Sequence, residues 1–170
     1  VKATFGTGSS LMTLTPVRTT SRHGLSGTIA WTTAQGTAYA LEGNITVSAQ
    51  AAAFMAKVLG LGSAQALSDL AQTVGDTGGA VFVPALAGLG APYWDDSATG
   101  TITGMTHGTT PAHLARAALE AIAHQIADVF AAMELDIDSA ISGLRADGGA
   151  SSNGFLMQIQ ADVLGRTVLR

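Results

Sequence analysis

The sequence has no cysteine, and only 12% of its 170 residues carry a charge. The absence of cysteine excludes a disulfide-stapled scaffold and a thiolate metal site, and it is typical of proteins in the reducing cytoplasm, where we expect this one. Acidic residues outnumber basic ones by 12 to 8. The resulting net charge of −4 argues against a nucleic-acid partner, which would require a basic surface.

A long uncharged apolar run is also missing. The most apolar stretch, Leu114 to Met133, is interrupted by Arg116, Glu120, His124 and Asp128, so no segment of ~20 uncharged residues could span a membrane. Apolar residues nevertheless make up 47% of the chain, which excludes disorder and is enough for the core of one domain. Because so little charge is left for its surface, we expect part of that surface to pack against a missing portion of a larger protein.

Hydrophobic periodicity and turn residues predict a mixed α/β domain, with an antiparallel β-meander in the first 47 residues. Thr110 is expected to cap a long helix whose first residue is Pro111, since proline is tolerated at that position. Ser63 is the expected cap of a shorter helix. The predicted strands lie at 1–14, 27–31, 37–42, 81–86, 101–105, 142–147 and 167–170, and the predicted helices at 46–59, 64–74, 111–134 and 153–164.

Two glycine-rich turns are candidates for ligand binding. The turn Gly6-Thr7-Gly8 lies between two strands, so it fails the dinucleotide fingerprint, which joins a strand to a helix. Its small side chains, free N–H groups and hydroxyls suit phosphate oxygens, although an ordinary hairpin turn has the same composition. The second turn, Asp147 to Asn153, joins a strand to a helix, whose N-terminus attracts anions or polar ligands. Here the alternative is a simple helix cap.

Other polar residues give weaker signals. The four histidines show no metal-ligand spacing, so no metal site is predicted. His124 lies four residues from both Glu120 and Asp128, which indicates a surface ladder of ion pairs on the long helix. Asp95 and Asp96 are interpreted as solvated turn residues. Neither a nucleophile elbow nor a phosphate-binding P-loop motif occurs.

Taken in order along the chain, several segments resemble the C-terminal domain of the FGGY carbohydrate kinases, and among these the glycerol kinases most closely. The resemblance extends from Ala3 to Arg170. The segments that carry it are the two glycine turns, Gly88–Asp95, Gly104–Gly108, Arg116–Gln125 and Leu144–Ala150.

The resemblance implies an actin-like, ribonuclease-H-like fold, in which a mixed sheet is flanked by helices and ATP binds between two domains. Residues 1–170 would form the C-terminal nucleotide-binding domain, and the N-terminal substrate domain would be absent. The implied reaction is Mg²⁺-assisted transfer of the γ-phosphoryl group of ATP to a hydroxyl of glycerol or a related polyol or sugar. A homo-oligomer is compatible with the resemblance.

The same resemblance assigns residues to the nucleotide. Thr7 matches the threonine of the phosphate-binding hairpin, where its hydroxyl and the Gly8 amide would face the β- and γ-phosphates. Gly149 and Asn153 match residues that flank the adenosine. The catalytic base of the family lies just upstream of the position that Val1 matches, so we expect the isolated chain to be inactive.

The sequence departs from the glycerol kinases at three of the matched positions. Ala49 replaces a glycine against the nucleotide, and Ala53 replaces a glutamine, so a side-chain hydrogen bond to the adenine side is lost. Ser10 stands where the glycerol kinases have a phenylalanine that packs on glycerol. This change predicts a larger or more polar substrate. A xylulose- or ribulose-type kinase and a non-catalytic nucleotide-binding module of the actin-like superfamily remain alternatives.

Overall fold

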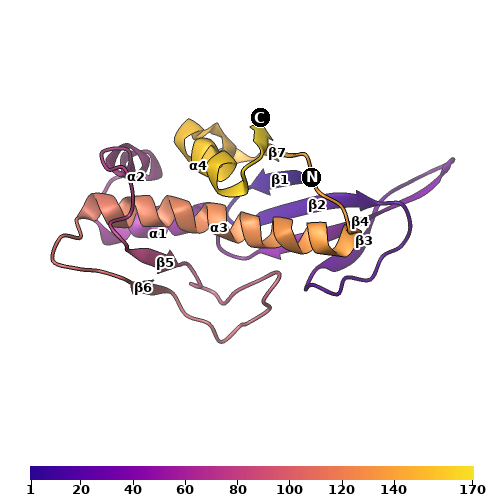
Figure 1. Ribbon diagram of the computed structural model, residues 1–170, viewed down its shortest axis with the longest axis horizontal. Helices are drawn as coiled ribbons and strands as arrows, with labels where there is room; N and C mark the ends of the chain where they lie inside the picture. The colour runs from indigo at the N-terminus through magenta and orange to yellow at the C-terminus, as the bar shows by residue number, and fades with distance from the viewer.

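The computed structural model describes residues 1–170, which form two sheets and four α-helices (Figure 1). The strands are β1 (Lys2–Phe5), β2 (Ser9–Thr15), β3 (Ser26–Thr33), β4 (Gly36–Ile45), β5 (Val81–Val83), β6 (Thr101–Thr103), β7 (Gly143–Asp147) and β8 (Thr167–Leu169). The helices are α1 (Ala49–Val58), α2 (Ala64–Ala71), α3 (Pro111–Ile137) and α4 (Gly154–Leu164), with a 3₁₀ turn, η1 (Gly149–Ser152), before α4. No helix combines the length and the apolar character that crossing a membrane requires.

The main sheet has six strands in the order β3-β4-β2-β1-β7-β8. Strands β1, β7 and β8 run parallel, whereas the β1–β2, β2–β4 and β3–β4 pairs are antiparallel. The predicted mixed α/β sheet is thereby confirmed, but the predicted meander is wrong because β4, and not β3, pairs with β2. The reason is burial: β4 ends in the buried residues Leu41, Gly43 and Ile45, whereas most of β3 is exposed and suits the edge.

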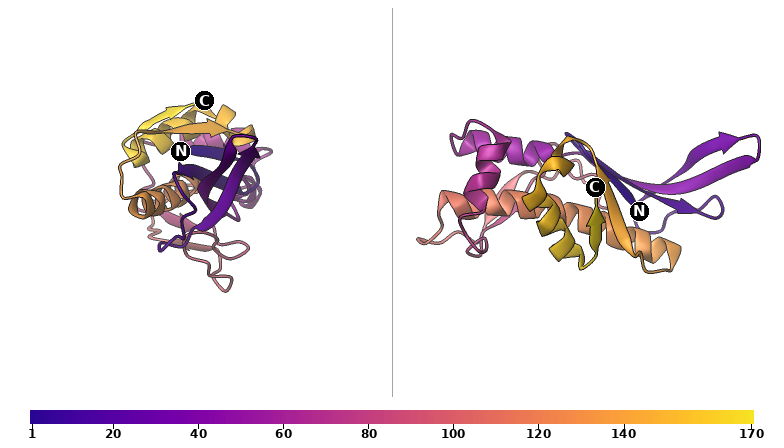
Figure 2. Two further views of the ribbon diagram at one scale, coloured as in Figure 1. Left: turned by 90° about the vertical axis from the view of Figure 1, so that its right-hand side faces the viewer. Right: turned by 90° about the horizontal axis from the view of Figure 1, so that it is seen from above.

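Helices α3 and α4 lie on the same side of this sheet (Figure 2). Alternate residues of the strands, among them Phe5, Leu11 and Leu41, point to that side and are fully buried. Gly43 marks the closest approach, because a Cβ atom there would collide with the Val129 side chain of α3. The β3–β4 hairpin extends beyond the helices, at the end of the molecule opposite α2 (Figures 1 and 2).

The long helix α3 has the predicted apolar stripe, although it ends three residues later, at Ile137. The stripe is buried except for Leu114, which is half-buried. Of the predicted ladder of ion pairs, Arg116–Glu120 forms at 2.7 Å, whereas the exposed His124 pairs with neither neighbouring carboxylate. Ser63 caps α2 as predicted, because its Oγ accepts from the Ala66 N–H at 3.0 Å.

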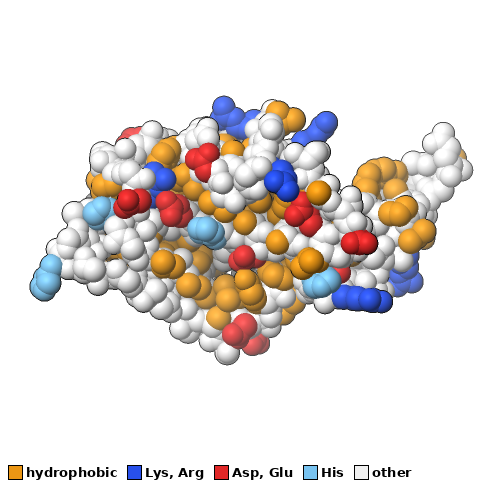
Figure 3. All heavy atoms as spheres, in the orientation of Figure 1, with side chains coloured by type: hydrophobic (Ala, Val, Ile, Leu, Met, Phe, Trp, Pro, Cys, Tyr) orange, Lys and Arg blue, Asp and Glu red, His pale blue; other side chains and the backbone are white.

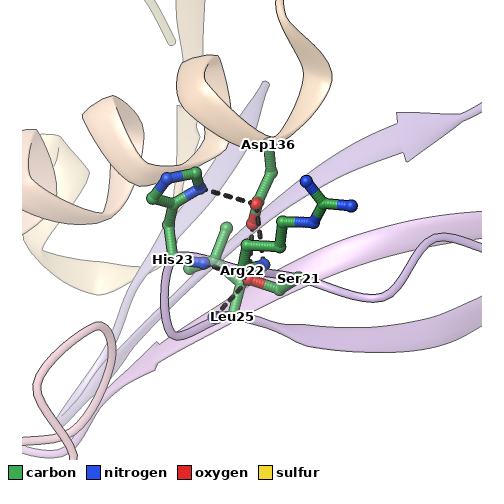
Figure 4. A network of polar contacts seen from close by, with 5 residues as sticks. All are labelled: Ser21, Arg22, His23, Leu25 and Asp136. Atoms are coloured by element: carbon green, nitrogen blue, oxygen red, sulfur yellow. Dashed lines mark hydrogen bonds and ion pairs between the residues drawn. The ribbon is translucent and has the colours of Figure 1, made fainter.

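Residues 16–25, which connect β2 to β3, are held by a buried carboxylate at the end of α3 (Figure 4). The Asp136 side chain is only 3% exposed and accepts hydrogen bonds from Ser21 Oγ and, at 2.9 Å, from the Arg22 N–H. His23 Nδ1 lies 2.7 Å from the same carboxylate. Burial disfavours the ionised carboxylate, but these hydrogen bonds outweigh it and hold the pKa of Asp136 below its usual value.

The same connection contacts the Gly88–Asp95 segment of the sequence. The Trp94 indole Nε1 donates to the Gly24 carbonyl oxygen at 2.6 Å. A Cβ atom at Gly24, where φ is +78°, would collide with the Pro92 carbonyl oxygen. One of the most specific motifs of the sequence therefore packs on a connection between two strands and contributes to the fold.

We expect the Asp136→Asn substitution to lower the free energy of unfolding by about 1–3 kcal/mol near pH 7. The buried carboxylate of Asp136 has three hydrogen-bond partners in residues 21–23, and the substitution replaces it by a neutral amide with a single acceptor oxygen. Since the pKa of Asp136 is lowered on folding, its stabilising contribution is complete above the ordinary value of 3.8 and is lost as the pH falls through the lowered value. Thermal unfolding of the full-length protein at a series of pH values measures the difference. Asp138→Asn, at an exposed left-handed position that asparagine tolerates, is the control. An equal loss of stability at every pH would contradict this account.

Candidate functional site

The turn between β1 and β2 lies directly against the N-terminus of α1. The Thr7 carbonyl oxygen accepts from the Ser48 and Gln50 N–H groups at 3.0 and 3.3 Å, and the Gly6 carbonyl accepts from the Ala49 N–H at 3.2 Å. Helix α1 therefore begins at Ala49, and not at residue 46 as predicted, because these backbone bonds satisfy its first N–H groups. The N–H groups of Thr7 and Gly8 donate to no atom of the chain. They stay available to a ligand.

Only glycine fits at position 8, because there is no space for a side chain. A Cβ atom there would collide with the Ile45 carbonyl oxygen and lie 2.9 Å from that of Thr46. The neighbouring Ser9 is buried and donates from its Oγ to Ser48 Oγ at 2.7 Å, which ties β2 to the residue that precedes α1. The turn, β2 and the start of α1 are thus one rigid unit.

The second glycine turn lies on the adjacent strand β7. Gly148 has a φ of +88°, and a Cβ atom there would lie 2.5 Å from the Phe5 carbonyl oxygen, so the turn packs tightly on β1. The predicted turn between strand and helix is confirmed, because β7 ends at Asp147 and α4 begins at Gly154, and a 3₁₀ turn at Gly149–Ser152 lies within it. Asn153 caps α4 with its Oδ1, which accepts from the Leu156 N–H at 3.1 Å and from Ser68 Oγ at 3.3 Å.

An open cavity lies between the two turns. Three of the residues that the sequence assigned to the nucleotide, Thr7, Ala49 and Gly149, line it together. Gly8 is the neighbour of Thr7 in the same turn, whereas Asn153 lies outside the lining. The complete lining is Phe5, Gly6, Thr7, Ala49, Gln50, Ala53, Gly149 and Ala150.

Gln50 is a lining residue that the sequence analysis missed. It is the second residue of α1, and its side chain is exposed at the cavity. Its position follows from the start of the helix at Ala49, which the backbone bonds to the turn determine. The predicted start at residue 46 placed Gln50 in the second turn of the helix and gave no reason to single it out.

Charged groups lie beside the cavity and not in its lining. Asp147, at the end of β7, forms an ion pair with Lys2 at 2.9 Å, and hydrogen bonds from Thr4 and Lys2 lower the pKa of its exposed carboxyl group. The lining contains no acidic or basic side chain, and no three His, Asp or Glu side chains of the chain come together as metal ligands. A divalent cation bound here would need ligands from outside these residues.

Ser10 does not belong to this cavity. It follows Ser9 on β2, so its side chain points to the opposite face of the sheet. There its Oγ donates to Glu42 Oε1 at 2.7 Å, and both side chains are half-buried. The structure therefore separates the residue assigned to the substrate from those assigned to the nucleotide.

The whole chain, residues 1–170, matches the model of the C-terminal domain of the FGGY family of carbohydrate kinases. The apulose kinase of Pectobacterium atrosepticum is 51% identical over 170 residues, which are all of this chain and 34% of that protein. The glycerol kinase of Citrifermentans bemidjiense is 50% identical over 171 residues, 99% of this chain and 34% of the relative. The chain thus spans about a third of the length of these relatives.

The fold agrees with this match. A crystal structure of Plasmodium falciparum glycerol kinase with ADP superposes with a TM-score of 0.90 and 32% identity, over 98% of this chain and 34% of that protein. The predicted actin-like domain is thereby confirmed. The chain belongs to the FGGY family of carbohydrate kinases and corresponds to their C-terminal domain.

Proposed function

We propose that the protein is an ATP-dependent kinase that phosphorylates a hydroxyl group of a polyol or sugar, and that residues 1–170 supply its nucleotide-binding wall. The observation that carries the proposal is the cavity between the two glycine turns, where Thr7, Ala49 and Gly149 meet. The related glycerol kinase of Plasmodium falciparum, whose structure was determined with ADP, has the same fold. The proposed partner is an N-terminal substrate domain in the part of the relatives that this chain does not cover.

Each residue has a distinct role in this proposal. The Thr7 hydroxyl and the unpaired N–H groups of Thr7 and Gly8 donate hydrogen bonds to the β- and γ-phosphate oxygens. Gly149 has no side chain, so the adenosine can lie against its backbone. Ala49 and Ala53 give the helix side of the cavity an apolar surface. Asn153 acts through its position as the cap of α4, which holds η1 and Gly149 in place.

The remaining parts of the reaction lie outside the chain. Phosphoryl transfer needs charge neutralisation and a correctly placed hydroxyl group in addition to the phosphate contacts. Mg²⁺ supplies part of that neutralisation when bound, but the residues of this cavity offer no carboxylate ligand for it. We propose that the catalytic base and most ligands of the metal come from the part of the relatives that this chain does not cover.

The environment of Ser10 supports a substrate more polar than glycerol. Its hydroxyl and the Glu42 carboxylate form a polar pair 2.7 Å apart where the glycerol kinases present an aromatic ring. A carboxylate with a free oxygen accepts hydrogen bonds from sugar hydroxyl groups. The apulose kinase among the relatives acts on a sugar, according to its name. We therefore favour a polyol or ketose with more hydroxyl groups than glycerol.

The nucleotide site is tested at Gly149, where a Cβ atom would meet nothing within 4 Å. We expect Gly149→Leu in the full-length protein to fold normally but to weaken ATP and ADP binding at least about tenfold, because the side chain occupies the space of the adenosine. Isothermal titration calorimetry measures the affinity, and thermal unfolding measures the stability. Gly62→Leu, in equally open space between α1 and α2, should change neither. Unchanged nucleotide affinity in Gly149→Leu would exclude this cavity as the site.

Kinase activity distinguishes the proposal from a non-catalytic nucleotide-binding module. With Mg²⁺ and ATP, the full-length protein should release ADP only when a suitable substrate is present, and a panel of glycerol, erythritol, xylulose, ribulose and apulose identifies it. The isolated 170-residue chain should be inactive, because one wall of the cleft is not enough. ATP binding without phosphorylation of any polyol or sugar would favour the non-catalytic alternative.

The role of Ser10 is tested by restoring the aromatic side chain. We expect Ser10→Phe to raise kcat/KM for glycerol relative to the preferred sugar by about tenfold or more, since the ring replaces polar contacts by an apolar surface. The ratio of the two kcat/KM values is the measurement. Thr33→Phe, at an exposed position at the far end of β3 opposite Gly36, is the matched control and should leave the ratio unchanged. A ratio unaffected by Ser10→Phe would remove Ser10 from the substrate site.

A further inference from the structure

A second cavity lies on α3, beneath the segment that carries β5 and β6. Its apolar wall comes mainly from that segment, with Phe82, Pro84 and Leu89, and its floor is the α3 surface around Ala117 and Ala121. Figure 3 shows hydrophobic side chains gathered on this face of the molecule, with acidic and histidine side chains around them. It shares no lining residue with the cavity between the glycine turns, so it is a separate site.

The two carboxylates that line this cavity make it acidic. Glu120 and Asp128 line it from α3, and no lysine or arginine does. Arg116 pairs with Glu120 at 2.7 Å, whereas Asp128 forms no ion pair with a basic side chain. The buried Oε1 of Gln125, another lining residue, has no hydrogen-bond partner. The cavity thus offers a carboxylate that no lysine or arginine neutralises, within an apolar surround.

Tyr93 closes the same end of the cavity. It lines the wall opposite α3, and partial burial together with the neighbouring Asp128 carboxylate raises the pKa of its hydroxyl group. The exposed His124 lies one helical turn from Asp128 on the rim. No lysine or arginine of the chain forms an ion pair with Asp128, so a bound cation would be favoured there.

We propose that this cavity binds a small amphipathic cation, in which a primary ammonium group is attached to an apolar body. The ammonium group lies at Asp128 and donates hydrogen bonds to its carboxylate oxygens. The apolar body packs against Phe82, Pro84 and Leu89. Both carboxylates disfavour an anionic ligand, and a neutral ligand of the same shape leaves the negative charge of Asp128 uncompensated.

The test uses the full-length protein and three probes with the same six-carbon chain: n-hexylammonium, 1-hexanol and hexanoate. Calorimetry or saturation-transfer NMR should give an affinity for hexylammonium at least about tenfold higher than for hexanol, with no binding of hexanoate. Asp128→Asn should reduce hexylammonium to the level of hexanol. Asp162→Asn, which removes an exposed carboxylate on α4 outside the cavity, should have no effect.

Several results would overturn the proposal: no binding of hexylammonium, equal binding of hexanol, or an affinity that Asp128→Asn leaves unchanged while thermal unfolding shows that the variant is folded. ATP affinity measured in the presence and absence of hexylammonium separates this site from the proposed nucleotide site. If ATP binds and hexylammonium does not, only the second site is excluded. If hexylammonium binds and ATP does not, the proposed function fails while the amine site stands.

Discussion

The structure depends on the backbone hydrogen bonds between the first glycine turn and the N-terminus of α1. The Thr7 carbonyl oxygen accepts from two N–H groups at the start of the helix, and the Gly6 carbonyl accepts from a third. A helix start normally attracts an anion, but here the turn itself satisfies the helix. The amides that stay free are therefore those of Thr7 and Gly8, and in the proposed function these amides, and not the first ones of α1, bind the phosphates.

This arrangement explains why glycine recurs at the site. A Cβ atom at Gly8 would collide with the carbonyl oxygens of residues 45 and 46, and one at Gly148 would collide with the backbone of Phe5. Close packing of one backbone segment against another therefore requires glycine at both positions. Gly149 differs, because the space around its Cα is open. Packing within the chain therefore does not require glycine at position 149. Gly149 lines the cavity that we propose for the nucleotide, and close approach of the ligand to its backbone would account for a glycine there.

The sequence predicted what depends on local pattern and failed where distant segments decide. Apolar periodicity was sufficient for α3, and turn residues located both glycine turns. The order of the strands was missed, because the meander assumed that neighbours in sequence pair, whereas the buried residues of β4 place it beside β2. Gln50 was missed for a similar reason: the start of α1 is determined by carbonyl oxygens more than forty residues earlier in the chain. Thr7 and Gly149 were assigned by resemblance, and the pairing of β1 with β7 is what brings their turns together.

The two serines that follow the turn show how one strand can serve two different requirements. Ser9 faces the helices and bonds to Ser48, so it belongs to the rigid unit that presents the amides of the turn. Ser10 faces the other side and bonds to Glu42 on β4. Because successive side chains of a strand point to opposite faces, a change at position 10 alters the polarity of one face without touching the hydrogen bond that Ser9 makes to Ser48 on the other. In the proposed function, substrate preference can therefore vary at Ser10 and Glu42 while the turn at Thr7 and Gly8, which needs a fixed geometry, is left intact.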